Sequence, residues 1–76
     1  MEQTKQYIRH FLHGELEAFV IRELVFLDPN VALLKLGDFC KNNCKFYKDA
    51  RYSDGKFYIG FNLPDQHVLI IDMVIS

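Results

Sequence analysis

Cysteine, glycine-rich segments and long apolar runs are all scarce in this sequence. The two cysteines, Cys40 and Cys44, are too few and too close together for the disulfide framework of a small secreted protein. The four glycines are scattered along the chain, which excludes a glycine-rich phosphate-binding loop. We therefore expect free thiols, a reducing compartment and a cytoplasmic location.

Membrane and export signals are also missing from the pattern. The first nine residues carry charges and no apolar signal core, and uncharged apolar runs such as residues 68–71 are far too short to span a bilayer. The sequence predicts neither export nor membrane insertion.

No charge of one sign dominates the chain. Nine Lys and Arg face ten Asp and Glu, so no overall field attracts nucleic acid or an acidic membrane. Half of the 76 residues are apolar and 25% are charged, which is typical of one packed domain over residues 1–76. So short a chain leaves little room for a catalytic cavity beside its core, and we expect a non-enzymatic protein without a cofactor.

Apolar residues in the first half recur at helical spacing. We predict helices at about residues 4–13, 16–27 and 29–41. Gly14 follows the first of these and predicts a break there. Asp28 before Pro29 is a helix cap with proline at the first helical position. Residues 18–27 are rich in β-prone side chains, so an additional strand is the alternative for that segment.

The second half predicts a three-stranded antiparallel meander at about residues 45–52, 56–63 and 67–75, and hence an α+β fold with the helices on one sheet face. Asp54-Gly55 fits a two-residue type I′ turn, and Pro64-Asp65-Gln66 fits a three-residue loop. The first turn pairs Tyr52 with Phe57, Ala50 with Ile59, Lys48 with Phe61 and Phe46 with Leu63. The second loop pairs Phe61 with Leu69, Ile59 with Ile71 and Phe57 with Met73.

The sheet face turned away from the helices is the predicted partner-binding site. The registers put Arg51, Tyr58 and Asp72 in one row across the strands, and the surrounding candidates are Tyr47, Ile70 and Val74. Tyrosine and arginine beside apolar side chains are typical of interaction hot spots. The alternative is that the charged residues are only solvated and that the chain's N-terminal block covers the apolar ones.

The last predicted strand is apolar on both faces except at Asp72, and it lies at the edge of the meander. Such an edge invites pairing. The strand is either covered by residues 18–27 acting as a fourth strand, or it joins a second copy of the chain or another protein. The sequence therefore predicts an inhibitor or adaptor that binds another protein, with a homodimer as a further alternative.

Residue patterns for two other functions, metal binding and nucleic-acid binding, are also present. His10 and His13 with Cys40 and Cys44 have residue types that suit zinc, but Lys41, Asn42 and Asn43 between the cysteines resemble a helix end, and we expect no metal. The local excess of basic residues in the segment 35–56, with aromatic residues between them, suggests a winged-helix-like nucleic-acid-binding protein as the second candidate. Its candidate recognition helix, residues 31–41, carries only two lysines and an apolar face expected in the core, which disfavours this function.

Overall fold

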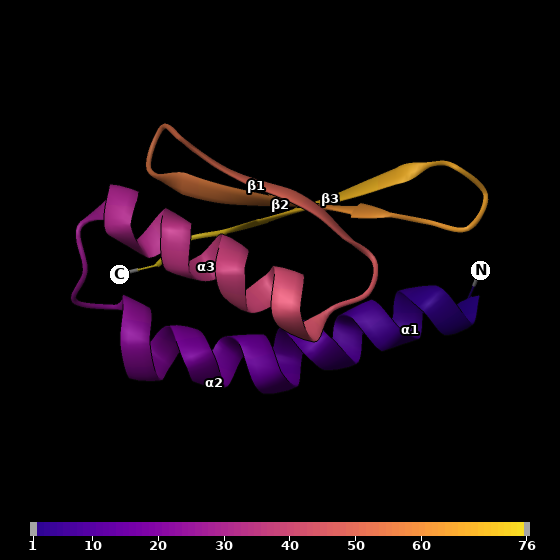
Figure 1. Ribbon diagram of the computed structural model, residues 1–76, viewed down its shortest axis with the longest axis horizontal. Helices are drawn as coiled ribbons and strands as arrows, with labels where there is room; N and C mark the ends of the chain where they lie inside the picture. Colours follow the sequence, from indigo (N-terminus) through magenta and orange to yellow (C-terminus); the bar gives the residue numbers. More distant parts are fainter. Residues whose placement is uncertain (1, 76) are drawn as a thin grey trace.

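The computed structural model describes residues 2–75 and has helices in the first half of the chain and strands in the second (Figure 1). The helical elements are α1 (Glu2–Phe11), η1 (Leu12–Leu16), α2 (Glu17–Phe19), η2 (Val20–Leu24) and α3 (Pro29–Asn43). The strands are β1 (Tyr47–Ser53), β2 (Lys56–Asn62) and β3 (Val68–Met73). The predicted α+β fold is confirmed.

The first four helical elements form one continuous helix over residues 2–24, which we call the long helix (Figure 1). The predicted break at Gly14 is wrong, and so is the strand alternative for residues 18–27. The helix continues through Gly14 with widened π turns, in which the Glu17 backbone N–H donates to the carbonyl of Leu12.

The spacing of buried side chains explains the π turns. Buried or half-buried positions recur every four residues at Thr4, Ile8, Leu12, Leu16, Val20 and Leu24. Four residues on a regular α-helix turn through about 400°, so the stripe would drift by about 40° at each step. The wider π turns absorb this drift and keep one stripe facing the sheet. Burial of that stripe outweighs the weak helix preference of Gly14.

Helix α3 starts where its cap residues predict. The Asp28 carboxylate accepts a hydrogen bond from the Asn30 backbone N–H at 3.1 Å, and Pro29 occupies the first turn. The helix ends at Asn43, two residues beyond the predicted end. It buries Ala32, Leu36 and Cys40.

Both predicted hairpin turns are present. Asp54 and Gly55 have φ of 52° and 80°, as a type I′ turn requires, and they join Ser53 to Lys56. In the second loop Gln66 has φ of 70°. The Leu63 N–H donates to the His67 carbonyl, so the loop between the two strands contains three residues, as predicted. The β2–β3 register is the predicted one, with Phe61 opposite Leu69, Ile59 opposite Ile71 and Phe57 opposite Met73.

The β1–β2 register is confirmed only near the turn. Tyr52 lies opposite Phe57 and Ala50 opposite Ile59, but a bulge between Tyr47 and Asp49 shifts the rest. Tyr47, not Lys48, lies opposite Phe61, and the Phe46 carbonyl accepts from the N–H of Asn62. The predicted pairs of Lys48 with Phe61 and of Phe46 with Leu63 are therefore wrong. The extra residue moves the start of β1 to the other face.

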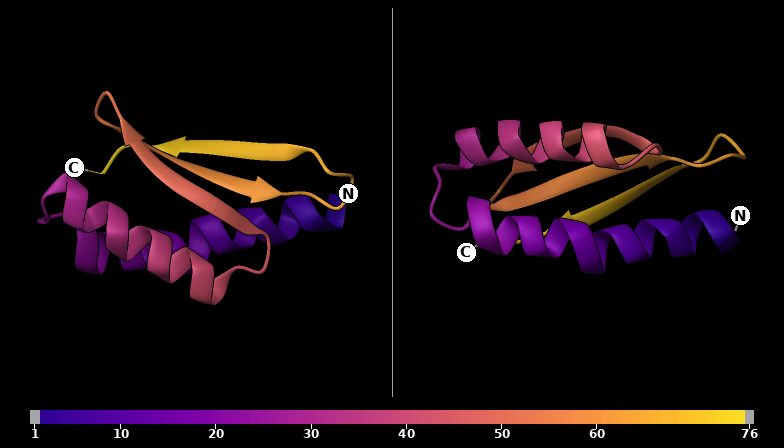
Figure 2. Two further views of the ribbon diagram at one scale, coloured as in Figure 1. Left: turned by 45° about the horizontal axis from the view of Figure 1, so that its top comes forward. Right: turned by 60° about the horizontal axis from the view of Figure 1, so that its bottom comes forward.

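The molecule has two layers, with the long helix and α3 on one face of the sheet (Figure 2). Strand order is β1-β2-β3, and β2 supplies the buried side chains Phe57, Ile59 and Phe61. Helix α3 packs against β1. Within residues 2–75 no helix lies over the opposite sheet face (Figure 2).

Candidate functional site

The open face is our name for the sheet face turned away from both helices (Figure 2). Its central row is the predicted one, because Arg51 pairs with Tyr58 and Tyr58 with Asp72. Tyr58 is half-buried, whereas Arg51 and Asp72 are exposed. The row therefore has an aromatic side chain at its centre between a cation and an anion.

An ion pair crosses one end of this row. Lys56 Nζ lies 3.8 Å from Asp72 Oδ2, and both side chains are about half exposed. Such solvated pairs contribute at most about 1 kcal/mol. Asp72 consequently stays exposed and weakly paired, and Arg51 on the other side of Tyr58 forms no ion pair among the described residues.

Apolar side chains flank the row along β3. Val68 is 44%, Ile70 53% and Val74 64% exposed. The alternative in which the N-terminal block covers them is wrong, because the long helix lies on the opposite face (Figure 2). Neighbouring exposed apolar residues beside tyrosine and arginine have the composition of a protein-binding patch.

The Asp49 carboxylate lies over Gly60 in the middle of the open face. An added Cβ at Gly60 would lie 2.8 Å from Asp49 Oδ1. Ile70 pairs with Gly60 on the other side. The absence of a side chain at Gly60 therefore leaves room for a carboxylate close to the apolar side chain of Ile70.

Tyr47 does not belong to the open face, although the sequence placed it there. The bulge sets it opposite the core residue Phe61, and its ring packs with the partly buried residues around the core. An added Cβ at Gly37 in α3 would lie 3.2 Å from the Tyr47 hydroxyl. Burial, followed by nearby Cys40, raises the pKa of Tyr47. Gly37 was the sequence signal, since it leaves space on α3 for this hydroxyl.

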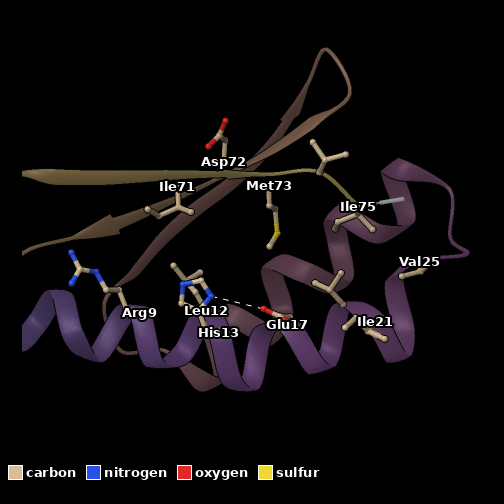
Figure 3. Close-up of a pocket in the computed structure, with 12 residues that line it drawn as sticks. Arg9, Leu12, His13, Glu17, Ile21, Val25, Ile71, Asp72, Met73 and Ile75 are labelled. Carbon is tan, nitrogen blue, oxygen red and sulfur yellow. Dashed lines mark ion pairs between the residues drawn. The ribbon is translucent and has the colours of Figure 1, made fainter.

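A second concave surface, which the sequence analysis missed, lies between the long helix and β3 (Figure 3). We call it the edge groove, and its volume is about 550 Å³. Its apolar lining comes from Leu12, Val20, Ile21, Val25, Ile71, Met73, Val74 and Ile75. Arg9, His13 and Glu17 follow one side of it along the helix (Figure 3). Two sequence features could have indicated this groove. They are the four-residue repeat of apolar positions in the long helix and the last strand, which is apolar on both faces.

The residues weighed for metal binding are distributed over the core and the surface. Cys40 and Cys44 are buried free thiols, while His10 and His13 are exposed on the long helix. Within residues 2–75 no three His, Cys, Asp or Glu side chains converge as metal ligands. Burial, with a smaller contribution from Cys44, raises the pKa of Cys40 to about 12, so its thiol is a weak nucleophile.

Two of the basic residues in the segment 35–56 interact with other side chains of the chain. The Lys45 ammonium lies 5.5 Å from the ring centre of Tyr7 and 5.2 Å from that of Phe46. Lys56 pairs with Asp72. Helix α3, the candidate recognition helix, buries Leu36 at its centre. No feature of the described residues favours the nucleic-acid function over protein binding, and it stays a prediction.

Comparison with known protein families, with curated proteins and with solved structures found no match to this chain. Among the helices in residues 2–75, none combines the length and the apolar character needed to cross a membrane.

Proposed function

We propose that this protein is a non-enzymatic binding module that holds another protein on its open face. The observation that supports this is the row of Arg51, Tyr58 and Asp72, which three paired strands hold beside exposed Ile70 and Val74. A paired sheet presents these side chains at a small cost in conformational entropy, because the backbone is already ordered.

The open face indicates the chemistry of the partner. Arg51 offers a planar donor for a carboxylate, and Asp72 accepts from a cation or an amide. Ile70 and Val74 offer apolar contact beside them. A partner surface that presents an acidic group, an apolar side chain and a hydrogen-bond donor to these residues fits this arrangement. The protein would then act as an inhibitor or adaptor.

The thiols fit a cytoplasmic location for this module. Cys40 and Cys44 are free and buried, a state that a reducing compartment preserves.

Affinity capture from the native host, with the tagged chain as bait, tests the proposal. We expect one protein in stoichiometric amount. Arg51→Ala and Tyr58→Ala should each weaken its binding by about 1–3 kcal/mol, which is about five- to 150-fold in Kd, with an unchanged circular dichroism spectrum. Lys35→Ala on α3 is the matched control and should bind as the parent chain does.

Two results would contradict the proposal. Unchanged affinity in both the Arg51 and the Tyr58 variants would exclude the open face as the contact surface. Capture of nucleic acid, with an affinity that falls steeply as salt rises, would replace protein binding by the nucleic-acid function.

A further inference from the structure

Strand β3 lies at an edge of the sheet but has the composition of an interior strand. Its side chains are apolar on both faces except at Asp72. The other edge strand, β1, has the protection usual for edges, because it carries charged residues and a bulge and packs against α3. The two edges therefore differ, and only β3 has the composition of a strand with neighbours on both sides.

The hydrogen-bonding groups on the free side of β3 follow from the second hairpin. The Leu63 N–H donates to the His67 carbonyl, so the Leu63–His67 pair is hydrogen-bonded. Hydrogen-bonded and non-hydrogen-bonded pairs alternate along an antiparallel ladder. The N–H and C=O groups of Val68, Ile70 and Asp72 therefore point away from β2, toward the free edge.

The edge groove lies beneath this free edge. Ile71, Met73 and Ile75 point from β3 toward the long helix, and Leu12 and Ile21 lie across from them (Figure 3). The groove therefore lies between the long helix and β3, next to the free edge of the strand. One additional strand beside β3 would bind the free backbone groups and place alternate side chains over the groove.

The charges beside the groove identify the chain that supplies this strand. Arg9, His13 and Glu17 are spaced by four residues, with a cation before His13 and an anion after it. The long helix and β3 run in the same direction (Figure 1). A second copy whose β3 pairs antiparallel therefore brings an antiparallel long helix, and Arg9 then faces Glu17 of the second copy. The pattern is complementary to itself under a two-fold rotation.

We infer that two copies of this chain associate through antiparallel pairing of their β3 strands into a six-stranded sheet. Ile71 lies at the two-fold axis in this pairing, so that Val68 lies opposite Val74 of the second copy. A register centred on Asp72 would set two carboxylates against each other, which is destabilising. The inference concerns the free edge and the groove, and it does not depend on the proposed function of the open face.

Charge exchange tests the pairing with exposed residues outside the open face. The parent chain should have twice the 9.0 kDa monomer mass in sedimentation equilibrium. Arg9→Glu and Glu17→Arg should each weaken association about tenfold or more, because each replaces two attractions by two repulsions. The double variant Arg9→Glu/Glu17→Arg should recover most of the parent association. Lys35→Glu, on an exposed position of α3 outside the groove lining, is the control and should associate normally.

Disulfide trapping tests the register. Antiparallel residues in a non-hydrogen-bonded pair have Cα atoms about 4.5 Å apart, within the range of a disulfide. Under mild oxidation Ile71→Cys should form covalent dimers, whereas Val68→Cys should not, because its two copies lie about 20 Å apart in this register.

The outcomes are decisive in both directions. A parent chain that stays monomeric throughout its soluble range overturns the inference. The antiparallel β3 arrangement is overturned if neither charge reversal weakens the dimer. It is also overturned if the double variant does not restore the association of the parent chain. Equal trapping of both cysteine variants overturns the register. None of these results alters the open-face test, which measures binding of a different protein.

Discussion

At the scale of single residues, the two thiols of the core are its most informative ionisable groups. Cys40 and Cys44 lie one helical turn apart, and the Cys44 N–H donates to the Cys40 carbonyl at 2.8 Å. Burial raises the pKa of both thiols, for Cys40 from 9.0 to about 12. The folded chain therefore holds these protons at pH values where the unfolded chain releases them.

This difference predicts a loss of stability in alkali. Below about pH 9 both states keep the Cys40 proton, so the thiol adds no pH dependence. As the pH rises from about 9 to about 12, the unfolded chain ionises first and the free energy of unfolding falls. Urea midpoints measured across this range should decline, and Cys40→Ala should show a shallower decline. A midpoint that is the same at neutral and alkaline pH would contradict the burial of the thiol.

At the scale of elements, two glycines have opposite roles. Gly55 has φ of 80° in the first hairpin turn, a conformation that a Cβ disfavours. Gly14 lies within the long helix, and an added Cβ would meet nothing within 4 Å. Gly55→Ala should therefore lower the free energy of unfolding by about 1 kcal/mol, and Gly14→Ala should raise it by about 0.5–1 kcal/mol.

Chemical denaturation of both glycine variants beside the parent chain measures the two effects. The opposite signs make each variant a control for the other. A stabilising Gly55→Ala would show that the turn is not type I′, and a strongly destabilising Gly14→Ala would show that the long helix is interrupted there.

The same elements show which parts of the fold local chemistry determines. The dipeptide Asp54-Gly55 and the alternation around it predict the hairpin and the row from Arg51 to Asp72, because a two-residue turn leaves a single pairing. The predicted break at Gly14 is wrong because the local preference of glycine for a break is worth only about 1 kcal/mol. Burial of the apolar stripe on both sides of Gly14 outweighs it, and that burial depends on the distant strands.

The bulge at the start of β1 could not be predicted from local alternation. Polar and apolar residues fit either register there, since residues 46–49 read Phe-Tyr-Lys-Asp. The choice depends on α3, where Gly37 leaves space for the Tyr47 hydroxyl. Tyr47 therefore packs against the core, whereas Arg51, Tyr58 and Asp72 have the predicted register near the turn. Their role in binding stays a prediction.

At the scale of the whole molecule, the helical layer leaves apolar side chains uncovered beside β3, among them Ile21. Two helices lie on one face of three strands, and the groove lies between the long helix and β3 (Figure 3). A chain of 76 residues has about 4–11 kcal/mol of total stability. Apolar groove residues that stay in contact with water add nothing to the free energy of unfolding. Covering them with a second chain would therefore stabilise the entire domain.

Stability should consequently depend on protein concentration. If the second copy binds only the folded chain, association adds to the free energy of unfolding in proportion to the logarithm of concentration, and Tm rises as the protein is concentrated. Calorimetry over a hundredfold dilution series measures this effect. When the chain is fully associated, the linkage relation gives a change of about 2.7 kcal/mol in the free energy of unfolding per dimer. Arg9→Glu should share the parent Tm at the lowest concentration but show a much smaller rise, because its exposed side chain stabilises the dimer and not the monomer. A parent Tm that does not change with dilution would show that the groove stays open in solution and that three strands are sufficient for the fold.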